Sequence, residues 1–434
     1  MVFCVGDCDN GKSQCARRKA DWAGAIHLII MPNSNNELTT GEYYGIQSKM
    51  RILRERVKEK TPLPRVVDLF CGCGGMSWGA KRAGFNVLAG VDHDIAAIDT
   101  YRRNFGEDAG YAVDLDHLSP KNFGEYSNLE PEELDLLIGG PPCQGFSKNV
   151  PRKFRYLEDS RNRLVRRFIE YAEYLRPRII IMENVAEMKK SFDGAYTDEI
   201  LERFTRAGYT VKVRVLFAPD YGVPQRRRRA FFFANRMDEK VIFPAATHFN
   251  GGQDSLFAMN ESSYTTVRDA LGDLPSLNHG EGKSPMEYDK PPMGWFQTEM
   301  RRNSEILYDH VARKLADTQF ERLASIRAGQ GAKDLPEHLK PKSHFSGAYG
   351  RLEWDDLAPT ITRWVFHPGS GRFGHPSDVR VITIREAARL QSFSDDFIFR
   401  GTYIQKSHQV GNAVPPLMMQ AIATEAKKLL RRQD

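Results

Sequence analysis

The sequence predicts an α/β protein with a mostly parallel sheet and a second, smaller domain of irregular structure. Its 434 residues are 41% hydrophobic and 27% charged, which is enough apolar material for a buried core and a length typical of two or three domains. From Pro64 onward, short apolar runs alternate with segments of helical periodicity, the pattern of parallel strands joined by helices. Between about residues 244 and 350 this alternation stops, and a stretch rich in Gly, Ser, Asn, Pro and His indicates the second domain.

The individual elements follow from the same pattern. The apolar runs that we expect to form buried strands are residues 65–70, 85–92, 134–140 and 178–185. Helical periodicity predicts helices near residues 76–84, 94–104 and 161–175. Two further extended stretches are residues 209–217 and 229–234.

Residues 1–60 differ in composition from the rest of the chain and are expected to form an N-terminal extension. Ile46, Met50, Leu53 and Val57 are spaced by four, three and four residues, which places them on one stripe of a helix. We expect this helix to dock on the protein through the stripe; contact of its basic face with a nucleic-acid backbone is the alternative. Three cysteines among the first 15 residues match no common zinc spacing, so we predict no metal site.

Composition also limits the class of protein. The formal net charge of +6 and the isoelectric point near 8.9 permit binding to nucleic acid without requiring it. No apolar run approaches the roughly 18 residues of a membrane-spanning helix, and the N-terminus lacks the apolar core of a secretory signal. Six cysteines are too sparse for a disulfide framework. We therefore expect a cytoplasmic protein without membrane contact, in which a thiol stays reduced and reactive.

A glycine-rich turn follows the first predicted strand. Asp68-Leu-Phe-Cys-Gly72-Cys-Gly74-Gly75 leads from that strand into a helix, and such glycines allow the backbone to approach a nucleotide closely. Asp92 closes the second strand, 20 residues after Gly72, where a carboxylate can accept hydrogen bonds from ribose hydroxyls. A dinucleotide-dependent dehydrogenase has much the same layout, so this turn alone leaves the function open.

The ends of two later predicted strands limit the possible functions further. The run 134–140 leads into Gly-Pro-Pro-Cys143, and Glu183 ends the run 178–185. Because ligands bind beyond the carboxyl ends of strands in an open α/β sheet, both side chains are expected at the site. A thiol beside a carboxyl group suits covalent addition coupled to proton transfer. A dehydrogenase would explain neither the Pro-Pro-Cys turn nor the Glu-Asn-Val strand end.

Seven motifs carry a resemblance to a known family. They are DLFCGCGG, GGPPCQGFS, DSRNRL, MENV, VPQRRRR, REAARLQSF and GNAVPP. In this order, over residues from about 64 to 430, the chain resembles the cytosine carbon-5 DNA methyltransferases of prokaryotic or phage type. The resemblance implies a Rossmann-like S-adenosylmethionine-dependent methyltransferase sheet with a second, smaller irregular target-recognition domain.

The resemblance also implies a division of the chain. Residues 1–60 are the extension, 61–243 the catalytic and cofactor-binding domain, and 244–380 the target-recognition domain with its return segment. Residues 381–434 then complete the catalytic domain.

The reaction implied by the resemblance uses a flipped cytosine of duplex DNA. Cys143, as a thiolate, adds to carbon 6, while Glu183 holds the N3 edge of the ring, and carbon 5 then receives the methyl group. Arg227 and Arg229 match family positions that hold the flipped base and order the catalytic loop. Because alternate residues of a strand share a face, we expect Gln225, Arg227 and Arg229 to point together toward the site. Their neighbours Arg226 and Arg228 should then face away.

The same resemblance implies a binding site for S-adenosylmethionine. Phe70, Gly72 and Gly74 match the pocket for its methionine and adenine parts. Asp92 matches the ribose ligand, and His93 lies where an aromatic ring commonly packs on adenine. The remaining matches are Asp114, the apolar contact Leu164, and Asn412 near the C-terminus. Asp114 is expected at the end of a third strand, which lies between the runs 85–92 and 134–140.

Alternatives remain open at this stage. A tRNA cytosine-5 methyltransferase has the same catalytic motifs, although the Cys-Phe-Thr element typical of its recognition region is absent from this sequence. A non-catalytic DNA-binding homologue is a second alternative. The expected partner is double-stranded DNA, which would make the protein nucleoid-associated when bound. A role in restriction-modification or host defence with a cognate restriction endonuclease, and an orphan enzyme, are equally consistent with the sequence.

Overall fold

The structure of the protein, a computed structural model, describes most of the chain from Met50 to Arg432. The described residues are 50, 53, 55–58, 61–142, 163–188, 194–250, 262–342 and 347–432. Ile46 and the three N-terminal cysteines lie outside these residues.

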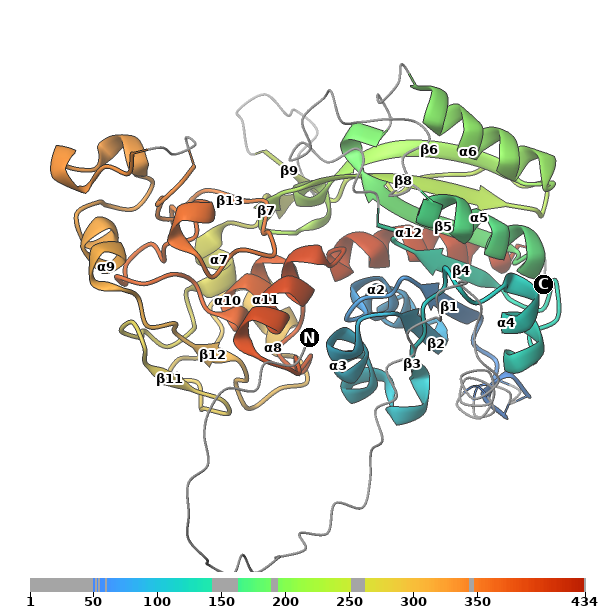
Figure 1. Cartoon of the computed structure of the whole chain (residues 1–434), viewed down its shortest axis with the longest axis horizontal. Helices are drawn as coiled ribbons and strands as arrows, with labels where there is room; N and C mark the ends of the chain where they lie inside the picture. The colour runs from blue at the N-terminus through green and yellow to red at the C-terminus, as the bar shows by residue number, and fades with distance from the viewer. Residues whose placement is uncertain are drawn as a thin grey trace, which may run out of the picture.

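A seven-stranded sheet forms the centre of the larger region (Figure 1). Its strands are β1 (Arg65–Leu69), β2 (Asn86–Asp92), β3 (Gly110–Ala112), β4 (Leu136–Gly139), β5 (Ile179–Val185), β6 (Thr210–Phe217) and β8 (Arg228–Asn235). They lie in the order β3-β2-β1-β4-β5-β8-β6, and β8 alone runs antiparallel, pairing with both β5 and β6. The predicted α/β class with a mostly parallel sheet is confirmed.

Helices cover both faces of this sheet. One face is covered by α2 (Gly75–Arg82), α3 (Ile95–Phe105) and α12 (Pro416–Leu430). The other is covered by α4 (Pro120–Ser127), α5 (Arg163–Leu175) and α6 (Ala195–Arg206).

Neighbouring strand residues supply the two apolar cores. Val66 and Leu136 pack with the first set of helices, whereas Val67 and Leu137 pack with the second. Since successive side chains of a strand point to opposite faces, a strand buried on both sides must be apolar throughout. This requirement explains the continuous apolar runs in the sequence.

The described part of the N-terminal helix docks on the second of these cores. Met50, Leu53 and Val57 are buried in the core formed with α4, α5 and α6. Arg56 donates a hydrogen bond to the backbone oxygen of Val87 on β2, at 2.8 Å. The stripe therefore faces the protein, as the docking interpretation predicts.

The remaining elements are short and form a second region, residues 244–412, beside the sheet (Figure 1). Its helices are α7 (Val267–Leu271), α8 (Trp295–Arg301), α9 (Asp317–Ala324), α10 (Ile384–Leu390) and α11 (Tyr403–Asn412). Its strand pairs are β9 (His248–Phe249) with β10 (Ser262–Ser263) and β11 (Gly282–Lys283) with β12 (His310–Val311). A third pair joins β13 (Ala358–Pro359) to β7 (Gln225–Arg226), immediately before β8.

Short 3₁₀ helices complete the connections. They are η1 (Glu107–Ala109), η5 (Ala218–Tyr221), η6 (Ala332–Asp334), η7 (Glu337–Leu339) and η8 (Pro368–Ser370). No helix in the described ranges has the length and apolar content needed to cross a membrane.

The C-terminal part of the chain contacts both regions. Helix α10 packs on α7 and β12, α11 packs on α10 and α3, and α12 packs on α2. Helices α10 to α12 therefore connect the second region to the helices that cover the sheet.

Candidate active site

The carboxyl ends of the parallel strands meet at one edge of the sheet, and antiparallel β8 begins there. Val185 at the end of β5 pairs with Arg229 near the start of β8. At this edge β1 has β2 on one side and β4 on the other, so the order of the strands reverses. Open α/β sheets bind ligands in the crevice outside such a reversal.

Glu183 is the buried carboxyl group of this edge. Its Oε1 lies 2.7 Å from Nε of Arg229, and only 8% of the residue is exposed. Burial raises the pKa of Glu183, because a low-dielectric surrounding disfavours the charged form, and Arg229 and Arg227 offset part of that rise. A raised pKa favours the protonated form of this carboxyl group, which is the form that a general acid uses.

The end of β5 is fastened to the turn that follows β4. Asn184 donates from Nδ2 to the backbone oxygen of Pro141 at 3.0 Å. A Cβ atom added to Gly140 would lie 3.3 Å from Oε2 of Glu183, so the carboxyl group lies directly against this turn. The turn leads to Cys143, which lies outside the described residues.

The three alternate residues of the VPQRRRR motif have different partners. Arg229 contacts Glu183, but Arg227 is 1% exposed and donates to backbone oxygens of Ile361 at 3.0 Å and Ala413 at 2.9 Å. Gln225 donates to the backbone oxygen of Leu390, on α10, at 2.7 Å. Of the three, only Arg229 forms an ion pair with the buried carboxyl group.

Arg227 therefore connects the start of β8 to the segment that carries Asn412. Its guanidinium also donates to the backbone oxygen of Gly411, so it binds the residues on both sides of Asn412. Burial lowers the pKa of Arg227. Its Nε is buried without a hydrogen-bond partner among the described residues.

The other two arginines of the motif face away, as the alternation predicts. Arg226 is exposed and pairs with Asp356. Arg228 is exposed and its guanidinium carbon lies 4.3 Å from the centre of the Phe217 ring.

The glycine-rich turn after β1 has room above it. Phe70, Gly72 and Gly74 all have positive φ angles, of 58°, 53° and 100°. A Cβ atom at Gly72 would meet nothing within 4 Å, whereas one at Gly74 would lie 2.6 Å from the ring of Phe105 on α3. The turn is thus closely packed against α3 at Gly74 and open at Gly72, where a ligand can approach the backbone.

Asp92 is held at this turn by backbone donors. Its Oδ2 accepts from the amide of Gly72 and its Oδ1 from the amide of Asp94, both at 2.9 Å. Oδ2 keeps a lone pair for a further donor. Nδ1 of the exposed His93 lies 3.2 Å from Asp92, and this hydrogen bond raises the pKa of His93 to about 8.

The remaining predicted cofactor residues border the same edge. Asp114 lies two residues beyond β3 rather than at its end, and its carboxylate contacts His117 at 3.0 Å. Leu164 is half-buried in the first turn of α5, which Arg167 ties to the backbone oxygen of Leu115 at 2.9 Å. Asn412 is exposed at the end of α11.

Asp68 is a buried carboxyl group that sequence reasoning did not single out. It accepts from the amide and hydroxyl of Ser77 at 3.2 and 2.6 Å, and that hydroxyl lies 2.8 Å from the phenol of Tyr101. Burial raises the pKa of Asp68 to about 7, and its Oδ1 has no partner within the described part of the chain. Asp68 is the first residue of the glycine-rich motif, and this position is the sequence signal that could have identified it as a candidate.

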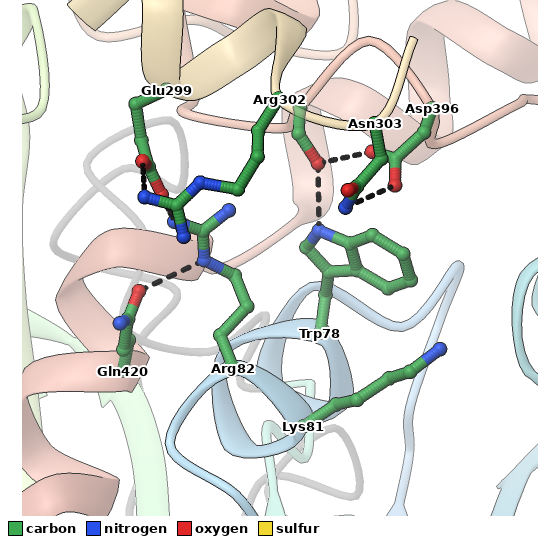
Figure 2. A pocket seen from close by; sticks show the side chains of 9 residues that line it. Trp78, Lys81, Arg82, Glu299, Arg302, Asn303, Asp396 and Gln420 are labelled. Atoms are coloured by element: carbon green, nitrogen blue, oxygen red, sulfur yellow. Dashed lines mark hydrogen bonds and ion pairs between the residues drawn. The ribbon is translucent and has the colours of Figure 1, made fainter. Parts of the chain in front are cut away.

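A cavity of about 290 Å³ lies elsewhere, between the sheet and the second region (Figure 2). Its walls come from the end of α2, from α8, from α12 and from the loop at residues 394–396. Arg82 bridges Glu299 and Gln420 across it, with Nε 2.9 Å from Oε1 of the glutamine. Because its polar groups are largely paired with one another, this cavity is a junction between the two regions.

Comparisons with known proteins decide the family. The family model for the C-5 cytosine-specific DNA methylases matches residues 64–428. The chain is 37% identical over 366 residues to the Type II methyltransferase M1.HphI of Haemophilus parahaemolyticus, covering 84% of this chain and 86% of that one. It is 32% identical to the Type II methyltransferase M.AgeI of Thalassovita gelatinovora, covering 84% of this chain and 99% of the relative. The chain belongs to the C-5 cytosine-specific DNA methylase family.

Solved structures agree with this assignment. The methylase is similar to a prophage-encoded protein of E. coli, solved as a candidate DNA modification methyltransferase, with a TM-score of 0.67 and 28% identity. That match covers 85% of this chain and 99% of the other. An Entamoeba histolytica methyltransferase shares the fold at a TM-score of 0.55 and 16% identity. The predicted Rossmann-like methyltransferase fold is confirmed, and family membership makes the protein a DNA cytosine-5 methyltransferase.

Besides Asp68, Asn184 was missed as a candidate at this methylase's site. Asn184 lies inside the MENV motif, which was already noted. Its role depends on Pro141, 43 residues away, and that of the expected Gln225 on Leu390, 165 residues away, partners that no local pattern indicates. Over the described ranges, no cluster of three or more His, Cys, Asp and Glu side chains is arranged to hold a metal.

Proposed function

We propose that this methylase transfers a methyl group from S-adenosylmethionine to carbon 5 of a flipped cytosine in a specific duplex DNA sequence. The observation that carries the proposal is the buried Glu183, paired with Arg229 and lying against the turn that leads to Cys143. The raised pKa of this carboxyl group supports a role in proton transfer.

In this proposal Cys143 and Glu183 act together on the cytosine ring, the first at carbon 6 and the second at N3. The Cys143 thiolate forms a bond to carbon 6 while Glu183 stabilises a proton at N3, so that electron density develops at carbon 5. When bound, S-adenosylmethionine would supply an electrophilic methyl group, with S-adenosylhomocysteine as the leaving group. Loss of the carbon-5 proton to a base, with water as a candidate, then restores the double bond and releases Cys143. Arg229 orients Glu183 and limits the rise of its pKa.

The turn after β1 fits the cofactor. The open space over Gly72 and the free lone pair on Oδ2 of Asp92 suit a nucleoside whose ribose donates hydrogen bonds. Asp92 would hold the ribose and Asp114 the adenine amino group. Around them, Phe70, Gly74, His93, Leu164 and Asn412 would form the rest of the pocket.

The proposed site of substrate recognition is residues 244–380, the larger part of the second region. A cytosine inside a duplex cannot reach the site, so it must be flipped out at a cost of a few kcal/mol. We propose that residues 244–380 read base edges in a groove, while 61–243 and 381–434 form the catalytic domain and 1–60 the extension. Because the relatives are Type II methyltransferases by name, a cytoplasmic restriction-modification role with a cognate endonuclease is the proposed setting.

Transfer of labelled methyl groups tests the proposal. The protein is incubated with labelled S-adenosylmethionine and either duplex DNA or tRNA, with Cys143→Ala as the test variant and Cys4→Ala, outside all seven motifs, as the control. We expect label in DNA, lost only with Cys143→Ala, and bisulfite sequencing should confine it to one short sequence. Label in tRNA alone would favour the RNA-modifying alternative. Cofactor binding with no label in either nucleic acid would favour a non-catalytic homologue.

A further inference from the structure

The segment 360–364 links the two halves of the site. It follows β13, and the hydroxyl of Thr360 donates to the backbone oxygen of Arg226 at 2.6 Å. Arg227 binds the backbone oxygen of Ile361, and the segment then passes so close to Gly411 that a Cβ atom there would clash with the backbone of Thr362. The segment therefore runs along the carboxyl edge of the sheet, from the start of β8 to the residue before Asn412.

This segment ends in two exposed side chains. Trp364 is 46% exposed, and Arg363 beside it is exposed with its guanidinium carbon 5.3 Å from the centre of the indole ring. Nowhere in the described ranges does a carboxylate form an ion pair with Arg363. A large apolar ring and a cation with unused donors thus stand together at the border of the site.

The backbone that carries them is held firmly. The hydroxyl of Ser407 donates to the backbone oxygen of Arg363 at 2.9 Å, and the hydroxyl of Ser370 donates to that of Trp364 at 2.5 Å. The ring of His408 packs edge-on against the indole, with ring centres 5.3 Å apart. Since these contacts already restrict the indole, binding a partner costs little additional ordering.

The patch also lies near the cofactor side of the edge. His408 is followed by Gln409, whose Nε2 donates to the backbone oxygen of Ala96 in the first turn of α3 at 3.0 Å, and Asp94 caps that helix. Asp94 is two residues after Asp92, at the end of β2. Arg363 and Trp364 thus border the crevice opposite the Glu183 side.

We propose that Trp364 and Arg363 form a DNA contact at the rim of the site, in which the indole packs on a nucleotide next to the target cytosine and the guanidinium binds a backbone phosphate. Every nucleotide offers an apolar face to an aromatic ring and a phosphate to an arginine, so the pair fits nucleic acid without base specificity. The inference rests on the proposed function, because it requires duplex DNA as the substrate.

Measuring the binding of duplex DNA to the full-length protein tests this proposed DNA contact. The probe is a labelled duplex that carries the sequence mapped by bisulfite sequencing. Trp364→Ala should weaken DNA binding by about tenfold at unchanged salt dependence, and Trp364→Phe should restore most of the affinity. Arg363→Ala should reduce the slope of log K against log salt by about one, the signature of a lost phosphate contact. Affinity for S-adenosylmethionine should stay unchanged in all three variants.

Two controls remove comparable groups from the opposite edge of the sheet. Leu63 precedes β1 and is 45% exposed, and Arg103 is exposed near the end of α3. Leu63→Ala and Arg103→Ala should leave DNA affinity and its salt dependence unchanged.

The failure of the inference can be separated from that of the proposed function. If the wild-type protein methylates DNA but Trp364→Ala binds it as tightly, the inference is wrong. If Trp364→Ala weakens only S-adenosylmethionine binding, the indole belongs to the cofactor pocket, and the inference is again wrong. If the wild-type protein neither binds nor methylates duplex DNA, the proposed function fails, and this inference fails with it.

Discussion

The two regions of this methylase bury carboxyl groups with opposite consequences. At the edge of the sheet, burial raises the pKa of Glu183, which has one arginine in direct contact. In the second region Asp395 is just as buried, but its pKa is lowered because Arg389 donates to both of its oxygens, at 3.0 and 2.6 Å. Glu386 behaves in the same way with Arg380.

The difference lies in how fully each charge is compensated. Arg380, Arg385 and Arg389 are all fully buried, and each binds carboxylates or backbone oxygens around α10. These charges hold short helices together where little regular structure is available. One of the two apolar cores continues from the sheet into the second region, so apolar packing does not distinguish the regions. The carboxyl group at the sheet edge differs in having a single arginine in direct contact, which leaves it available for chemistry.

The largest effect is expected for Glu183→Gln. The amide cannot take up the proton that the reaction moves, so the rate of methyl transfer should fall by about 10²- to 10⁴-fold. Single-turnover kinetics measures this rate. Glu173→Gln is the control, because Glu173 also pairs with an arginine, Arg203, but on the outer helices α5 and α6. Equal rates for Glu183→Gln and the wild type would show that the buried carboxyl group is structural, like those of the second region.

The second effect is a loss of folding stability, which we expect only when a buried ion pair of the second region is broken. Arg389→Ala removes the arginine that binds both buried Asp273 and Asp395, leaving only Arg301 on the first and Arg385 and Tyr288 on the second, and we expect a loss of about 3–5 kcal/mol in the free energy of unfolding. Urea denaturation measures this quantity. Arg268→Ala removes an arginine whose pair with Asp355 is exposed, so unfolding should hardly change. A small effect for Arg389→Ala would contradict the structural role assigned to the second region's charges.

The third effect is a difference in pH dependence between the regions. The pKa of Asp68 is raised from 3.8 to about 7, so its contribution to stability is complete below pH 3.8 and is lost as the pH rises toward 7. Asp395, whose pKa is lowered, contributes stability that is lost as the pH falls. Asp68→Asn does not titrate, so its stability relative to the wild type should rise by up to about 1.4 kcal/mol per pH unit over this range.

Urea unfolding of the cofactor-free protein at several pH values measures the Asp68 effect. The exposed Asp99, replaced by Asn, should follow the wild-type profile. A constant difference between Asp68→Asn and the wild type from pH 4 to 7 would mean that Asp68 stays ionised in the folded protein.

The smallest effect tests how the short helices begin. Thr402 caps α11 and exchanges hydrogen bonds with Gln405, so Thr402→Ala should cost about 1 kcal/mol of stability. Helix α2 of the sheet begins at Gly74 with no side-chain cap and depends on packing instead. Thr424→Ala, on the exposed side of α12, serves as the control and should cause no loss, which a thermal melt can establish.

Local sequence patterns predicted most of the strands of the sheet and placed the candidate site at the carboxyl ends of those strands. Continuous apolar runs gave the ranges of β1, β2, β4 and β5 to within two residues, because a strand buried on both faces must be apolar throughout. Three of the helices that cover the sheet were missed, α4, α6 and α12, although Ser119 and Pro120 are typical of a helix start and Ser119 does cap α4. The direction of β8 could not be predicted, since composition does not encode the direction of a strand.

The sequence by itself determined which residues gather at the edge: the glycine turn with Asp92, the end of β5 with Glu183, and the alternation that separates Arg227 and Arg229 from their neighbours. Only the tertiary structure decided what each of them contacts. Arg227 binds backbone oxygens 134 and 186 residues away instead of the buried carboxyl group. The periodicity of a strand specifies the side to which a side chain points, whereas its partner and its pKa depend on the segments that the fold brings against that side.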